Sequence, residues 1–85
     1  MADLAEKFKT AMEEVKKLPT RPDNETLLKL YSLFKQSTEG DVSGQRPGFA
    51  DFKGRAKYDA WAELKGKSRE KAMEDYIDFV NELKG

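Results

Sequence analysis

Apolar side chains recur at steps of three and four along this chain, and no segment alternates between apolar and polar residues with a period of two. Steps of three and four place side chains on one face of an α-helix, whereas a half-buried strand needs alternation. The pattern therefore predicts an all-α fold with no sheet. The three clearest stripes are Leu4, Phe8, Ala11, Val15 and Leu18; Leu27, Leu30, Tyr31 and Phe34; and Ala72, Met73, Tyr76, Ile77, Val80 and Leu83.

Capping and helix-ending residues divide the chain into four predicted helices. An oxygen-bearing side chain that can accept the first free backbone N–H groups stands before each helix. These N-cap candidates are Asp3, Asp23 or Asn24, Asp51 and Ser68. A proline or glycine follows the first three helices, because neither residue continues a helix readily. These expected stops are Pro19, Gly40 and Gly66.

The segment 40–50 is predicted to be a loop, because it contains glycines and a proline and reads G-D-V-S-G-Q-R-P-G-F-A. It is longer than the usual helix–helix connection in a bundle, which has about two to eight residues. Such a loop lets the chain cross to a non-adjacent position, or it supplies part of a binding site. The fold class is therefore predicted to be a four-helix bundle.

Composition limits the chemistry open to this chain. Its 85 residues form one domain with a modest core, so an open groove is a more natural site than a deep cavity. It has no cysteine and no histidine, which excludes disulfides, Cys/His zinc sites, cysteine nucleophiles and Ser-His-Asp triads. We therefore expect no catalytic residues, no metal and no enzyme activity.

Charge and hydropathy limit the partners and the location. Sixteen basic and sixteen acidic residues cancel, which argues against non-specific nucleic-acid binding. No run of about eighteen apolar residues occurs, so we expect no stable membrane insertion. The N-terminus lacks the apolar core of a signal peptide. We expect a cytoplasmic monomer.

Cations and aromatic rings interleave in the two middle helices. Lys35 lies one turn beyond Tyr31, and Lys53 and Lys57 share one face of the third helix. For most such clusters a solvated surface is the simpler interpretation. If the two helices come close, however, Lys35 and Lys57 can converge on one phosphate. The neighbouring rings favour a ligand with both phosphates and a flat or apolar part.

Two tyrosines stand out among aromatic residues that are otherwise expected to form the core. Tyr31 and Tyr76 lie on apolar stripes, yet each carries a hydroxyl that needs a partner if it is buried. A tyrosine at the edge of a core can stack on a base and also donate to a phosphate. Both residues are therefore candidates for a binding site as well as for the core.

Nearly the whole chain resembles the acyl-CoA-binding protein family. The order, spacing and loop length of three stretches carry the resemblance: L-L-K-L-Y-S-L-F-K-Q-S-T-E-G-D, R-P-G-F-A-D-F-K-G-R-A-K-Y-D-A-W and L-K-G-K-S-R-E-K-A-M-E-D-Y-I. The resemblance implies one acyl-CoA-binding domain over residues 1–85, with a long overhand connection between the second and third helices. It also implies an intracellular carrier and pool former for medium- and long-chain fatty acyl-CoA, with no cofactor and possible transient contacts to acyl-CoA-using enzymes.

The same resemblance implies the site. Tyr31, Lys35 and Lys57 would hold the adenine nucleotide, with the two lysines at the ribose 3′-phosphate. The implied ligand-binding residues are Lys16, Tyr31, Ser32, Leu33, Phe34, Lys35, Lys53, Lys57 and Tyr76. The implied acyl-chain groove consists of Met12, Leu27, Leu28 and Phe52.

Three positions depart from the usual family pattern, namely Phe34 in place of Tyr, Tyr58 in place of Trp, and Met12 in place of a smaller residue. They bear on affinity and chain-length preference. Two other functions stay open at this point. An interaction module, or a peptide ligand for a protein partner, is the first alternative. A thioesterase is the second, and the lack of a nucleophile–base pair argues against it.

Overall fold

The computed structural model describes residues 3–85, so the predicted domain 1–85 begins two residues before the described part. The chain forms four helices and, within residues 3–85, no strand. The predicted all-α four-helix fold is confirmed. The helices are α1 (Leu4–Val15), α2 (Asn24–Glu39), α3 (Phe52–Ala62) and α4 (Arg69–Lys84).

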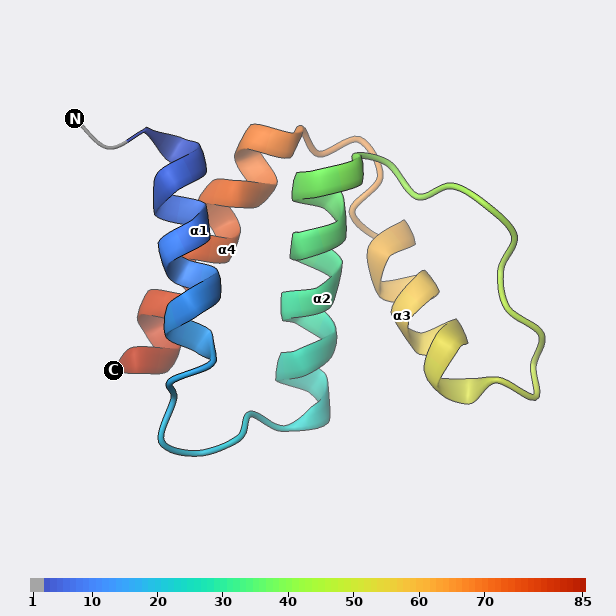
Figure 1. Ribbon diagram of the computed structural model, residues 1–85. Helices are drawn as coiled ribbons and strands as arrows, with labels where there is room; N and C mark the ends of the chain where they lie inside the picture. Colours follow the sequence, from blue (N-terminus) through green and yellow to red (C-terminus); the bar gives the residue numbers. More distant parts are fainter. Residues whose placement is uncertain (1–2) are drawn as a thin grey trace.

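The long connection between α2 and α3 follows from the direction of the helices. In Figure 1, α2 and α3 run the same way, and α1 and α4 run the opposite way. The chain must therefore return along the full length of α3 before that helix can begin. An 11-residue helix is about 16 Å long, and a two-residue turn spans only about 7 Å. Residues 40–51 make this return as an extended connector beside α3.

All four helices begin where capping chemistry predicts. The side-chain oxygens of the N-cap residues accept backbone N–H groups three positions later, at 2.8–3.0 Å. Asp23, rather than Asn24, caps α2. The complete set of N-caps is Asp3, Asp23, Asp51 and Ser68.

Helix ends are predicted less well than helix starts. α2 ends at Gly40, which has φ 81°, as expected. α3 was predicted to stop at Gly66 but ends at Ala62. Beyond Ala62 the backbone tightens, since the N–H of Leu64 donates to the carbonyl of Trp61 at 3.0 Å. A three-residue turn therefore replaces the last helical turn, and Gly66 (φ 96°) closes that turn instead.

The apolar core lies between α1, α2 and α4. α4 packs against both α1 and α2, whereas α3 packs against α2. The rings of Phe8 and Tyr76 meet edge to face, with their centroids 5.0 Å apart. Most of the predicted stripes of α1 and α4 face this core, but Leu18 lies beyond the end of α1 at Val15. Its buried members are Phe8, Ala11, Leu30, Leu33, Tyr76 and Val80.

The stripe predicted for α2 is only partly correct. Leu30 is buried, but Phe34 is 37% exposed, and Leu33, Gln36 and Ser37 are buried in its place. The physical reason is that α2 is central and packs against α3 as well as α4. A helix with two partners buries more than one stripe, and its second buried face need not be apolar.

Candidate functional site

Two cation–aromatic pairs join α2 and α3. Lys57 Nζ of α3 lies 5.4 Å from the ring centroid of Tyr31 on α2. Lys35 Nζ of α2 lies 4.9 Å from the ring centroid of Trp61 on α3. The pairs are reciprocal and one helical turn apart, because the two helices run in the same direction. The structure thus brings Tyr31, Lys35 and Lys57 to one interface, which meets the condition that the sequence analysis set for the two lysines to share a phosphate.

The two lysines differ in their partners. Lys35 forms an ion pair with Glu39 one turn away, and this hydrogen bond raises the pKa of Lys35 above its usual value. Lys57 is exposed and has no ion-pair partner within residues 3–85. Lys57 is therefore the freer of the two cations for an anionic ligand, whereas Lys35 would share its charge with Glu39.

Aromatic residues of α3 also tie the connector to the helix. The indole Nε1 of Trp61 donates to the carbonyl of Gly40 at 2.8 Å. The hydroxyl of Tyr58 donates to the carbonyl of Gly44 at 3.1 Å. Tyr58, which departs from the family pattern, thus has a structural contact of its own that keeps the connector on α3.

An exposed ion pair also attaches the connector to α3. Arg46 donates from two nitrogens to the two carboxylate oxygens of Asp59, at 2.8 and 2.7 Å. The guanidinium of Arg46 lowers the pKa of Asp59 below its usual value. In this structure Arg46 therefore holds the connector on α3.

Several implied site residues point into the protein. Leu33 is 2% exposed and belongs to the core, and Ser32 is 4% exposed with its hydroxyl donating to the carbonyl of Lys29 at 2.9 Å. Tyr76 is 4% exposed, and burial raises the pKa of its phenol. The side chains of Ser32 and Leu33 present no surface to a ligand in this conformation. Tyr76 packs mainly as a core ring.

The remaining implied residues are more accessible. Lys16 and Lys53 are exposed, and Met12, Leu27 and Leu28 are half-buried. Phe34 is stacked near Phe8 with the ring centroids 6.3 Å apart. Exposed apolar rings are most prominent where the connector meets α3. These rings are Phe49, at 76% exposure, and Phe52, at 79%.

Sequence reasoning missed two residues beside this site. Phe49 lies in the loop, where no helical stripe draws attention to it, but its place in the R-P-G-F stretch three residues before Phe52 was a usable signal. Gln36 is fully buried and bonds to both connectors of α3. Its position between Lys35 and Ser37 resembles an ordinary polar helix surface, so nothing in the sequence marked it.

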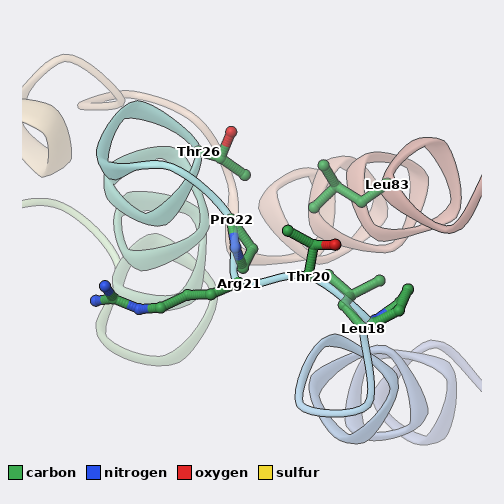
Figure 2. A pocket seen from close by; sticks show the side chains of 7 residues that line it. Leu18, Thr20, Arg21, Pro22, Thr26 and Leu83 are labelled. Atoms are coloured by element: carbon green, nitrogen blue, oxygen red, sulfur yellow. The ribbon is translucent and has the colours of Figure 1, made fainter.

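Two small open hollows on the surface lie elsewhere. One, of about 250 Å³, is formed by the α1–α2 connection and the end of α4. Figure 2 shows Leu83 facing it, while the guanidinium of Arg21 points away. The other, of about 320 Å³, lies between α1 and α4. Neither contains an implied ligand residue.

A small helical domain with lysines and aromatic rings gathered on one open surface belongs to the class of ligand-binding proteins. The family profile described as Acyl CoA binding protein matches residues 5–80. The chain is 48% identical to the acyl-CoA-binding protein homolog of Drosophila melanogaster over 80 residues, 94% of this chain and 93% of that protein. It is 51% identical to the acyl-CoA-binding protein of Brassica napus over 80 residues, 94% of this chain and 87% of that protein.

Solved structures agree with the sequence comparison. The crystal structure of Oryza sativa acyl-CoA-binding protein 2 matches with a TM-score of 0.90 and 47% identity, covering 95% of this chain and 90% of that one. The crystal structure of the acyl-CoA-binding protein of Moniliophthora perniciosa matches with a TM-score of 0.87 and 40% identity, covering 98% and 80%.

This chain belongs to the acyl-CoA-binding protein family. It is a binding protein and not an enzyme, and the ligand of the family is acyl-CoA. Within residues 3–85, no helix is both long and apolar enough to cross a bilayer, and no cluster of acidic side chains is arranged to hold a metal ion.

Proposed function

We propose that this chain binds medium- and long-chain fatty acyl-CoA thioesters and acts as an intracellular carrier and pool former. It would work as a single-domain cytoplasmic monomer that keeps the ester dissolved and releases it intact through transient contacts with acyl-CoA-using enzymes. The observation that carries the proposal is the reciprocal pairing of Lys57 with Tyr31 and of Lys35 with Trp61 across α2 and α3.

The nucleotide end is assigned to this α2–α3 interface. Lys35 and Lys57 would meet the ribose 3′-phosphate, because an ammonium group gives a phosphate a compact charge with several donors. The ring of Tyr31 would stack on the adenine, replacing or sharing the contact that it now makes with Lys57. Lys16 and Lys53, both exposed, would add to the positive potential around the remaining phosphates.

The acyl chain is assigned to the accessible apolar side chains. Phe52 and the neighbouring Phe49 are the most exposed large apolar residues in the described chain, which supports a role in covering the ligand. Met12, Leu27 and Leu28 supply half-buried apolar surface from α1 and α2. Phe34, without a hydroxyl, would contribute apolar contact only.

The expected affinity is consistent with these assignments. Burying about ten methylene groups at about 0.8 kcal/mol each contributes about 8 kcal/mol before the costs of association. Charge-assisted phosphate contacts and stacking on adenine make a nanomolar complex, near −12 kcal/mol, physically reasonable. Coenzyme A without a chain should bind much more weakly, and free fatty acid more weakly still.

Calorimetric titration with palmitoyl-CoA, coenzyme A and palmitate tests the proposal. Palmitoyl-CoA and palmitate are kept below their critical micelle concentrations. We expect tight one-to-one binding of the thioester and much weaker binding of both fragments. Folded protein that ignores palmitoyl-CoA would reject the carrier function. The alternative of an interaction module, or a peptide ligand for a protein partner, would then lead.

A further inference from the structure

α3 is held in a different way from the other helices. Its packing partner is α2, and Trp61 is its only buried residue. Trp61 is thus its main apolar anchor. α3 also carries Lys57, which must meet Lys35 of α2 if the two are to bind one phosphate. Directional contacts that help to set the position of α3 therefore matter for the site.

Gln36 makes such a contact from the last turn of α2. Its side chain is completely buried, and its Nε2 donates to the carboxylate of Asp41 at 2.9 Å and to the carbonyl of Lys67 at 2.7 Å. Asp41 lies in the connector that leads into α3, and Lys67 lies in the connector that leads out of it. A single amide of α2 therefore joins the start of the first connector to the second connector, beside the C-terminal ends of α2 and α3.

Two further bonds close this arrangement. The same Oδ1 of Asp41 accepts the backbone N–H of Gly66 at 2.9 Å, so the two connectors are joined to each other. Trp61 Nε1 donates to the carbonyl of Gly40 at 2.8 Å, which ties the end of α3 to the end of α2. We call the set of Gln36, Asp41, Gly66 and Lys67 the α3 clasp.

The clasp retains an unfavourable feature. Gln36 Oε1 is buried and has no hydrogen-bond partner within residues 3–85. Reversing the amide would aim this oxygen at two acceptor oxygens, so the orientation is fixed by Asp41 and Lys67. An apolar residue of similar size would avoid the unpaired oxygen but would lose both donated bonds. The two donated bonds, which no apolar residue can make, are what link α2 to the connectors of α3.

We infer that Gln36 is a positioning residue that sets α3 against α2 and thereby builds the subsite for the CoA 3′-phosphate. It adjoins Lys35 in the chain and fixes the segment that carries Lys57, but it contacts no ligand itself. This inference rests on the proposed function. It makes recognition of the phosphate depend on a residue that does not itself face the ligand.

The variant Gln36→Leu tests this, because leucine has a similar size and no donors. Calorimetry would give the dissociation constants for palmitoyl-CoA and for palmitoyl-3′-dephospho-CoA, in wild type and variant. We expect the wild type to prefer the 3′-phosphorylated ester and the variant to lose about tenfold of that preference, the effect of weakening one charge-assisted contact. Affinity for the dephosphorylated ester should change little. A residue that only stabilises the fold would weaken both ligands together.

Val80→Ala is the matched control. Val80 is fully buried in α4 and lies outside the clasp and the site. Its truncation lowers stability by opening a cavity, and the preference for the 3′-phosphate should stay at the wild-type value. Urea unfolding would establish that both variants are folded under the binding conditions.

The outcomes are separable. If wild type does not bind palmitoyl-CoA, the proposed function fails. If wild type binds both esters equally, or folded Gln36→Leu keeps the full preference, the inference on Gln36 is overturned while acyl-CoA binding stands.

If Gln36→Leu does not fold, Asp41→Ala decides, since Asp41 is exposed and its truncation removes one bond of Gln36 and the bond of Gly66. A reduced preference would support the inference, and an unchanged one would overturn it.

Discussion

The packed part of this molecule (α1, α2 and α4) and the α3 segment with its two connectors are stabilised by different forces. The packed part buries apolar side chains such as Phe8, Leu30 and Val80. The α3 segment buries only Trp61 of its helix and is fastened by hydrogen bonds from Gln36 and by the exposed Arg46–Asp59 pair. Apolar burial is large and non-directional, whereas hydrogen bonds contribute less but fix geometry.

Because of this difference, we expect the free energy of unfolding and the binding of the ligand to depend on different parts of the molecule. Substitutions in the packed part should lower the free energy of unfolding and leave ligand preference intact. Substitutions of exposed side chains at the α2–α3 interface should change binding and leave the free energy of unfolding almost unchanged. Two matched pairs of substitutions test this separation. One pair truncates a phenylalanine in each region, and the other removes a lysine from each region.

The largest expected effect comes from truncating a phenylalanine in each region. Phe8 is 5% exposed and packs on Tyr76, so Phe8→Ala should lower the free energy of unfolding by about 3–5 kcal/mol. Phe52 is 79% exposed, so Phe52→Ala should change it by less than about 0.5 kcal/mol. Urea denaturation at equilibrium measures both values. Similar losses in the two variants would show that the two regions share one packing unit.

The same contrast explains how much of the fold the sequence could predict. α1 and α4 were predicted well because each presents one apolar stripe to one core. α2 was predicted only in part, because its second buried face is formed by Gln36 and its neighbours, which have no apolar signature. The end of α3 was misplaced at Gly66 because a bond from its N–H to Asp41, far away in the chain, helps to shape that turn.

The candidate site shows a similar division. Tyr31, Lys35 and Lys57 could be placed together, since their helical spacing needs only that α2 and α3 lie side by side. A resemblance assigns positions but not the direction of a side chain, so it could not show that Ser32 and Leu33 point inward. Gln36 could not be found at all, because its burial depends on two connectors that fold over it.

A charge removed from the α2–α3 interface should have the next largest effect. Lys57→Ala should weaken acyl-CoA binding by about 2–3 kcal/mol, because a charge-assisted phosphate contact is lost. The free energy of unfolding should change by less than about 1 kcal/mol, since Lys57 is exposed, has no ion pair within residues 3–85, and loses only its contact with the Tyr31 ring. Calorimetric titration with palmitoyl-CoA gives the affinity. The matched control is Lys9→Ala, which removes an exposed lysine from α1. Equal losses in both variants would indicate a diffuse charge effect instead of a contact.

Acidification should have the smallest effect, and it should begin at α3. Backbone hydrogen bonding from Gly66 and a bond from Gln36 lower the pKa of Asp41, and the guanidinium of Arg46 lowers the pKa of Asp59. A carboxyl group whose pKa is lowered by folding stabilises the folded state above its unfolded pKa, about 3.9. That contribution is lost as the pH falls through the lower folded value. No change is therefore expected between about pH 7 and pH 5.

Below about pH 4 the attachments of α3 should weaken before the packed part opens, because the packed part relies mainly on apolar burial, which does not titrate. Asp75 of α4 loses its ion pairs in the same range, since, against the effect of burial, bonds from Lys67 and Lys71 lower its pKa. Amide hydrogen exchange at pH 6 and pH 3, corrected for intrinsic rates, should show protection lost in residues 40–66 while α4 stays protected. The cap of Asp23 shares the same dependence, since its pKa is also lowered, but its loss affects only the first turn of α2. Uniform loss of protection across all four helices would mean that the α3 segment and the packed part unfold as one unit, which would remove the basis for separating binding geometry from stability.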